Sequence, residues 1–500
     1  MMNEAKKISS AFFSQLILGY GNFAITIISA LVLIPLYINI FGLAEYGKWL
    51  TVNGIVGLAA CLTLNGGSII IKVMTRYSNN MSLTLALLKK FRKFYIVNLV
   101  VLIICLVVPL NILITEPPET ISKASLVFIS MALIIIAFLN EYARSVVIGS
   151  LRIQRYVIFS LIGKLITLCS ILFLLDLQTI IIIPGGILIG EVFILGAALI
   201  VGRDYYQAEV DVSVDKSLDS RYGIKTFISN SVGTSSELFT KSAEYPVISF
   251  LLGPEVLASY SILRKFADML STLANTLTSS MIASTSKYIS KLSSYYLMRF
   301  SCDYILLFTG VIVSLMTFYI CLSPYFLVFW LGEAQTLALP TDSIYVISGS
   351  ICAWYVSNSA LSLLTINGDF MTRAKYSIVG VFIYAFLLSA LGDHATLELI
   401  VSVQLLTYCV LFILALRGFG YNFFIRALKV WPLIIICVLT IYYLLGSINS
   451  VLDLSGFGAR FESFGHLIVS GVVTVITLYI FVYQIIKIDW VLPNRIKEFM

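Results

Sequence analysis

The chain has 500 residues, of which 59% are hydrophobic and 12% are charged, and its mean hydropathy is +0.98. This composition excludes an ordinary soluble globular protein. Together with repeated apolar runs of about 20 residues, it predicts an all-α polytopic membrane protein. The formal net charge of +7 is typical of basic loops on the cytoplasmic side of a membrane, so we expect no nucleic-acid partner.

Fourteen apolar segments follow one another along the chain, and we expect each to cross the bilayer as a helix. They are residues 12–38, 47–71, 94–114, 122–148, 157–175, 179–201, 224–251, 255–284, 301–322, 342–366, 377–391, 397–416, 430–447 and 465–486. If the N-terminus is cytoplasmic, 26 of the 33 Lys and Arg residues fall on the cytoplasmic side, Arg373 among them, and the outer loops hold Lys48, Lys123 and Arg460. This bias predicts that both termini are cytoplasmic.

A short internal repeat divides the chain. Pro35 precedes Gly42 by seven residues at the end of the first span, and Pro246 precedes Gly253 by seven at the end of the seventh. Because six spans separate the copies, the repeats are parallel and would enclose a central cavity. We expect an N-terminal six-helix lobe at 1–202, a cytoplasmic linker at 203–222, a C-terminal six-helix lobe at 223–416 and two additional transmembrane helices at 417–500.

The two prolines of the repeat also predict bends. Pro246 lies inside the seventh span and removes one backbone hydrogen bond, which neighbouring polar groups can compensate in a membrane bundle. We expect a bend at Pro246 that helps to close the outer side of the cavity, and a similar bend at Pro35.

Two adjacent spans carry polar stripes. The seventh has Asn230, Thr234, Glu237, Lys241 and Glu244, and the eighth has Arg264, Asp268, Ser271, Asn275 and Thr278. The spacing in both is 4, 3, 4, 3, which places each set on one face of a helix. A charge at mid-bilayer costs at least about 2.5 kcal/mol, so these stripes face other helices or a water-filled cavity.

Two interpretations of the intramembrane polar groups stay open. They line a cavity that binds substrate, or they pair and hold helices together, as the i,i+4 pairs Glu237–Lys241 and Arg264–Asp268 could do. Lys164 and Glu191 lack a partner on their own helices, which favours function or cross-helix pairing. The candidate cavity residues are Lys241, Arg264, Lys265 and Lys164, the carboxylates Glu237, Glu244, Asp268 and Glu191, and the amides Asn230, Asn275, Asn22 and Gln15.

Three span exits resemble a known family. The stretches PLYINIFGLAEYGKW, ISFLLGPEVLASYS and PYFLVFWLGE are similar to those of the polysaccharide-transporter family, within the multidrug/oligosaccharidyl-lipid/polysaccharide flippase superfamily. Its members include flippases for O-antigen and capsule repeat units. The resemblance implies a non-enzymatic flippase in the bacterial cytoplasmic membrane. It would move undecaprenyl-pyrophosphate-linked oligosaccharide to the outer leaflet by alternating access, beside other polysaccharide-assembly membrane proteins.

Two other functions are weighed against this one. An ion-coupled multidrug exporter of the same fold generally uses a carboxylate in its N-terminal lobe, often in the first span, yet residues 12–38 contain none. A membrane polysaccharide polymerase or glycosyltransferase needs a sizeable outer loop, and the outer loops here are short. Four cations face four carboxylates within the spans, a balance that fits an anionic substrate only if some carboxylates are protonated. We therefore expect a proton or sodium as coupling ion, and no cofactor, metal or catalytic residue.

Overall fold

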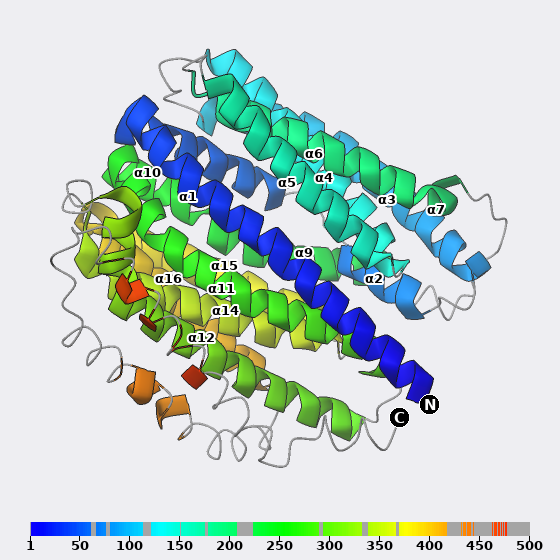
Figure 1. Ribbon diagram of the computed structural model, residues 1–500. Coiled ribbons are helices and arrows are strands. Elements are labelled where there is room, and N and C mark those ends of the chain that lie inside the picture. Colours follow the sequence, from blue (N-terminus) through cyan, green and yellow to red (C-terminus); the bar gives the residue numbers. More distant parts are fainter. Residues whose placement is uncertain are drawn as a thin grey trace. The chain divides into compact units, whose positions relative to one another are not determined.

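The computed structural model describes residues 2–61, 67–76, 81–113, 122–150, 152–175, 179–207, 224–289, 294–332, 339–366 and 370–417, with scattered positions between 432 and 477. These residues form helices and no strands, which confirms the all-α fold (Figure 1). By length and composition, seven of the described helices could cross a membrane. The chain is therefore a multi-pass membrane protein.

The described helices account for the first twelve predicted spans. They are α1 (Met2–Cys61), α2 (Gly67–Arg76), α3 (Met81–Leu113), α4 (Lys123–Gly149), α5 (Ile153–Leu174), α6 (Ile182–Val201), α7 (Arg203–Gln207), α9 (Ile224–Ser242), α10 (Glu244–Leu252), α11 (Pro254–Ile289), α12 (Ser294–Leu331), α14 (Ile344–Ile366), α15 (Phe370–Leu391) and α16 (Leu397–Arg417), with short 3-10 turns at Thr341–Ser343 and Gly392–His394. The predicted spans 430–447 and 465–486 lie largely outside the described residues, as does the predicted linker beyond Gln207.

The two glycines of the internal repeat have the same backbone conformation. Gly42 has φ 82° and ψ 165°, and Gly253 has φ 93° and ψ 162°. Residues with a Cβ rarely adopt this region, so glycine is required at both positions. The repeat predicted from the sequence is therefore visible in the backbone at the exits of the first and seventh spans.

The seventh span is interrupted next to its proline. Helix α9 ends at Ser242 and α10 begins at Glu244. Pro246 has no N–H to donate to the Ser242 carbonyl, and the helical ladder resumes when Val247 N donates to Ala243 O at 3.0 Å. Ala243, the residue between the two helices, keeps helical backbone angles (φ −65°, ψ −24°), so the loss of one hydrogen bond is present and the bend predicted at Pro246 stays a prediction.

The first span behaves differently from its counterpart. Helix α1 runs through Pro35, and its non-helical backbone falls at Gly42. The bend predicted at Pro35 is thus displaced to the glycine. Proline's own φ is compatible with a helix, so the loss of one hydrogen bond does not by itself end the helix.

The described chain divides into two compact units. Unit A comprises residues 14–258 and 369–383, and unit B comprises residues 1–13, 259–368 and 384–500. Helix α15 is continuous and contributes residues to both units.

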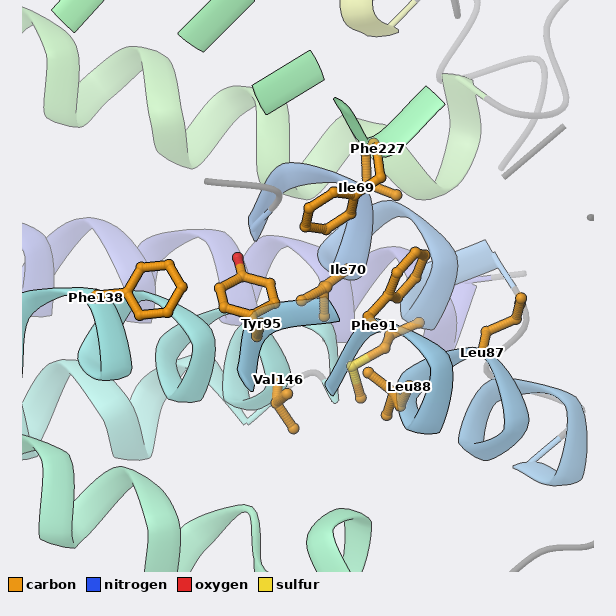
Figure 2. Packing of buried hydrophobic residues seen from close by; sticks show 10 residues of the cluster. Ile69, Ile70, Leu87, Leu88, Phe91, Tyr95, Phe138, Val146 and Phe227 are labelled. Atoms are coloured by element: carbon orange, nitrogen blue, oxygen red, sulfur yellow. The ribbon is translucent and has the colours of Figure 1, made fainter. Parts of the chain in front are cut away.

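An aromatic cluster in unit A joins α9 to helices of the first half. Phe227, at the start of α9, stacks on Phe91 with ring centroids 5.4 Å apart and meets Phe94 edge-on at 4.7 Å and Tyr95 at 5.7 Å. Figure 2 shows the rings of Phe227, Phe91 and Tyr95 among buried aliphatic side chains of α2, α3 and α4. Burial of so much apolar surface fixes the first turn of α9 against α3.

Unit B is held by packing and a few buried hydrogen bonds. The Phe266 ring of α11 stacks on Phe326 of α12 at 4.0 Å, and Tyr319 of α12 donates to the Leu263 carbonyl at 2.9 Å. Helices α14 and α16 lie side by side, and Ser350 donates to Gln404 at 3.2 Å between them.

Candidate functional site

The second part of α1 and the α9–α10 segment meet at backbone distance within unit A. Small residues at turn spacing on α1 make this possible. A Cβ on Gly47 would lie 1.9 Å from Pro254 O, one on Gly54 2.6 Å from Tyr245 Cβ, and one on Gly57 3.0 Å from Ser242 Oγ. Between them, Thr51 donates to Ser249 at 2.6 Å. Along these contacts the residue numbers rise on α1 and fall on α9–α10, so the two segments run antiparallel. We call this contact the glycine seam.

A buried ion pair connects α9 to α15. Arg373 donates from Nε to Glu237 Oε1 at 2.8 Å and from Nη2 to Glu237 Oε2 at 2.6 Å. The Ser377 hydroxyl lies 3.0 Å from the same Oε1. The exposed fractions of the Arg373 and Glu237 side chains are 8% and 9%. Two parallel N–H donors on one carboxylate form the strongest geometry available to an Arg–carboxylate pair.

Glycine again allows the helices that carry this pair to approach closely. A Cβ on Gly233, one turn before Glu237, would lie 3.3 Å from Ala374 Cα. Farther towards the start of α9, Ser229 contacts Met371 Sδ at 3.8 Å. Along these contacts the residue numbers rise on both helices, so α9 and α15 run parallel. This direction agrees with their positions as the predicted seventh and eleventh spans, which cross the membrane in the same sense.

These contacts correct two expectations. Glu237 pairs with Arg373 of another helix, whereas the i,i+4 spacing pointed to Lys241. Arg373 was counted among the cytoplasmic loop charges, but α15 begins at Phe370 rather than at the predicted residue 377, and the Arg373 side chain is buried. Arg373, which is distant in the sequence, pairs with Glu237 in place of Lys241 because two parallel hydrogen bonds to a buried carboxylate outweigh a single i,i+4 pair on one helix.

A second polar constellation lies in the first half of the chain, where α5 crosses α6. Gly163 and Gly190 allow this crossing: a Cβ on Gly190 would lie 1.9 Å from Thr167 Oγ1 and 2.7 Å from the Gly163 carbonyl oxygen. The residues that follow the two glycines are Lys164 and Glu191. The crossing thus positions one predicted cation and one predicted carboxylate near each other.

Lys164 and Glu191 each have a partner on a different helix. Lys164 Nζ donates to Thr26 Oγ1 of α1 at 2.7 Å. Asn140 Nδ2 of α4 donates to Glu191 Oε2 at 2.5 Å and to the Glu191 carbonyl at 3.0 Å. Cross-helix pairing, one of the readings left open for these residues, is therefore present, and the partner of Lys164 is a neutral hydroxyl.

The predicted i,i+4 pair of the eighth span is present in unit B. Arg264 Nε donates to Asp268 Oδ2 at 3.2 Å, and Arg264 Nη1 donates to the Tyr260 hydroxyl at 2.8 Å. The Arg264 residue is 5% exposed. These two contacts use two of the five N–H donors of the guanidinium, so the pairing does not by itself exclude contact with a substrate anion.

The other predicted residues fall into three groups. Asn230 and Glu244 are fully buried in unit A, so their stripe faces protein rather than lipid. Lys241 in unit A and Lys265 in unit B are partly buried. For Gln15, Asn22 and Asn275 the structure describes the helical backbone and not the side chain. Among the described residues, no group of three or more His, Cys, Asp and Glu side chains could hold a metal ion.

Arg373, Ser377 and Asn140 belong to these constellations and are absent from the sequence-based set. One signal could have found the first two: an Arg followed by a Ser one turn later at the start of an apolar span. Asn140 carries no comparable signal, because a single amide in an apolar helix is compatible with many roles.

No protein-family model and no curated protein matches the chain. Among solved structures, the lipid II flippase MurJ in an inward closed conformation is similar with a TM-score of 0.57 and 12% identity, over 96% of this chain and 99% of that one. An outward-facing multidrug resistance MATE family transporter of the MOP superfamily matches with a TM-score of 0.57 and 13% identity, over 83% of this chain and 96% of that one.

A third similar structure is a MOP superfamily transporter from Pyrococcus furiosus Vc1, with a TM-score of 0.55 and 13% identity over 84% of this chain and 97% of that one. At such identities the likeness shows the fold alone. The chain is thus a multi-pass membrane protein with the fold of the multidrug/oligosaccharidyl-lipid/polysaccharide (MOP) transporter superfamily.

Proposed function

We propose that this protein is a flippase of the polysaccharide-transporter family, in the bacterial cytoplasmic membrane with both termini cytoplasmic. It moves undecaprenyl-pyrophosphate-linked oligosaccharide repeat units of the O-antigen or capsule type from the inner to the outer leaflet by alternating access. The two six-helix lobes at 1–202 and 223–416 alternate around a central cavity, a proton or sodium gradient supplies direction, and other polysaccharide-assembly proteins act beside it.

The extent of the structural matches carries this proposal. The lipid II flippase covers 96% of this chain, whereas the multidrug resistance transporter covers 83% although its own chain is 96% covered. A substantial part of this chain thus has a counterpart in the flippase and none in the exporter. The extra matched length supports a flippase-like architecture, and the lipid-linked substrate is part of our proposal.

Lys164 is the cation that we assign to the pyrophosphate or its nearest sugar. It lies within an apolar helix, is partly exposed, and its hydrogen-bond acceptor is the neutral Thr26 hydroxyl. An ammonium group at this depth does not face lipid, so it faces the polar interior. A phosphate oxygen can replace the Thr26 hydroxyl as acceptor with a gain in charge assistance. Lys241, Lys265 and Arg264 remain further candidate contacts.

Transport by purified protein tests the proposal. The full chain is reconstituted in proteoliposomes that contain undecaprenyl-pyrophosphate-linked oligosaccharide, and a lectin measures exposure of the sugar on the opposite leaflet. A charged hydrogen bond contributes about 1.5–3 kcal/mol, so Lys164→Gln should slow exposure by about 10- to 100-fold. Lys93→Gln is the matched control, because it makes the same substitution at an exposed lysine of α3.

The same vesicles also test the alternative function, a multidrug exporter. Uptake of a fluorescent cationic drug driven by a proton or sodium gradient, with no movement of the lipid-linked sugar, would contradict the flippase function. Sugar exposure at the parent rate in Lys164→Gln would leave the flippase intact and refute the assignment of Lys164.

A further inference from the structure

Both oxygens of the Glu237 carboxylate accept hydrogen bonds from groups of the chain itself. Both oxygens accept from Arg373, at 2.8 and 2.6 Å, and Oε1 also lies 3.0 Å from the Ser377 hydroxyl. That hydroxyl is 2.9 Å from the Arg373 carbonyl as well, so its position is fixed from two sides. Ser377 and Arg373 lie one turn apart on α15, which presents them together to α9.

A buried carboxylate that stays ionised in a membrane protein needs a compensating positive group. An isolated ionised carboxylate in an apolar environment is very unfavourable, and it persists only with a paired or coordinated positive group. The charged groups that face Glu237 are Arg373 on α15 and, one turn along its own helix, Lys241. The guanidinium makes the direct contact, and its planar fork matches both carboxylate oxygens.

We propose that Arg373 is a built-in cation that permanently fills the carboxylate site of the seventh span. Glu237 therefore takes up no soluble coupling ion and binds no cationic substrate. The close approach of Gly233 to Ala374 keeps the two helices near enough for the pair to persist. The inference concerns the ion chemistry of this half of the protein and does not depend on the substrate that is moved.

The first half offers a contrast at the equivalent position. Gly42 and Gly253 are equivalent positions of the internal repeat. The same offset in residue number makes Thr26 the first-half equivalent of Glu237. In each half this position meets a cation from the fifth helix of the same half, Lys164 for Thr26 and Arg373 for Glu237. Only the second half has a carboxylate there to neutralise the cation, so the two halves differ in charge at matched positions.

Chemical rescue tests the built-in cation directly. Purified full-length Arg373→Ala protein in detergent is heated with guanidinium chloride far below denaturing concentrations, or with sodium or choline chloride at equal ionic strength. Loss of one partner of a buried pair should lower the unfolding midpoint by about 5 °C. Guanidinium ion should restore much of that loss by entering the vacated space. The double variant Glu237→Gln with Arg373→Ala should lie near the parent and ignore guanidinium, and Arg144→Ala should behave like the parent.

Three results would overturn the proposal. One is stabilisation of the parent by sodium relative to choline that Glu237→Gln abolishes, since Glu237 would then be open to a soluble cation. Another is equal rescue of the single and double variants by guanidinium. If Arg373→Ala does not accumulate, the double variant must accumulate like the parent, because no charge is left unpaired; its failure would also refute the built-in cation.

Discussion

Replacing Gly47 by alanine should open the glycine seam. The new Cβ would lie 1.9 Å from the Pro254 carbonyl oxygen and 2.5 Å from its carbon, whereas ordinary contact begins at 3.4 Å. These are backbone atoms and cannot rotate away, so the helices must separate by about 1.5 Å. A shift of that size would stretch the Thr51–Ser249 hydrogen bond from 2.6 Å to about 4 Å, beyond bonding range.

The expected cost follows from these changes. Overpacking costs about 1–3 kcal/mol, and a lost hydrogen bond adds about 1 kcal/mol. Alanine regains up to about 1 kcal/mol of helix propensity. The net loss is roughly 1–3 kcal/mol, which should lower the thermal midpoint of the purified protein by a few degrees.

Gly196→Ala in α6 is the control for this change. A Cβ there meets no atom within 4 Å, so the substitution should be neutral or slightly stabilising through helix propensity. A Gly47→Ala protein that melts at the temperature of Gly196→Ala would refute the close approach at the seam.

Three further outcomes are expected. Gly190→Ala should destabilise the α5–α6 crossing, measured as a lower thermal midpoint, because its Cβ would lie 1.9 Å from Thr167 Oγ1; an unchanged midpoint would argue against the crossing. Tyr319→Phe should cost about 1 kcal/mol, since its hydroxyl donates to the Leu263 carbonyl at 2.9 Å, and denaturation by a graded series of detergents should detect the loss. A reporter fused after Met500 should indicate the cytoplasmic side, and an outer signal would contradict the predicted topology.

Features set by local chemistry were predictable from the sequence. The helices follow from apolar runs, and the exits at Gly42 and Gly253 follow from a residue type that alone tolerates their backbone. The interruption beside Pro246 follows from a missing donor. Each of these depends on residues within one or two turns, so no knowledge of the tertiary structure was needed.

The ion-pair partner of a buried charge was not predictable, because it depends on which helices pack against each other. The i,i+4 spacing pointed to a pair between Glu237 and Lys241. In the structure α9 lies against α15, and the buried guanidinium of Arg373 donates two hydrogen bonds to Glu237 instead. The charge of Arg373 also led to a predicted start of this span at residue 377, after the true start of α15 at Phe370, since a basic residue before an apolar run usually indicates a loop. By contrast, Arg264 and Asp268 paired as expected because no fork from another helix reaches that carboxylate among the described contacts.

The glycine seam has a covalent consequence. The hydroxyl oxygens of Thr51 and Ser249 are 2.6 Å apart, which makes these two positions the choice for an engineered pair of cysteines, whose Cβ atoms must lie about 3.5–4.5 Å apart to form a disulfide. Oxidation would lock α1 to α10, and a reductant would release them. If transport requires these helices to separate, the locked protein would be a single trapped conformer whose activity is switched by redox chemistry.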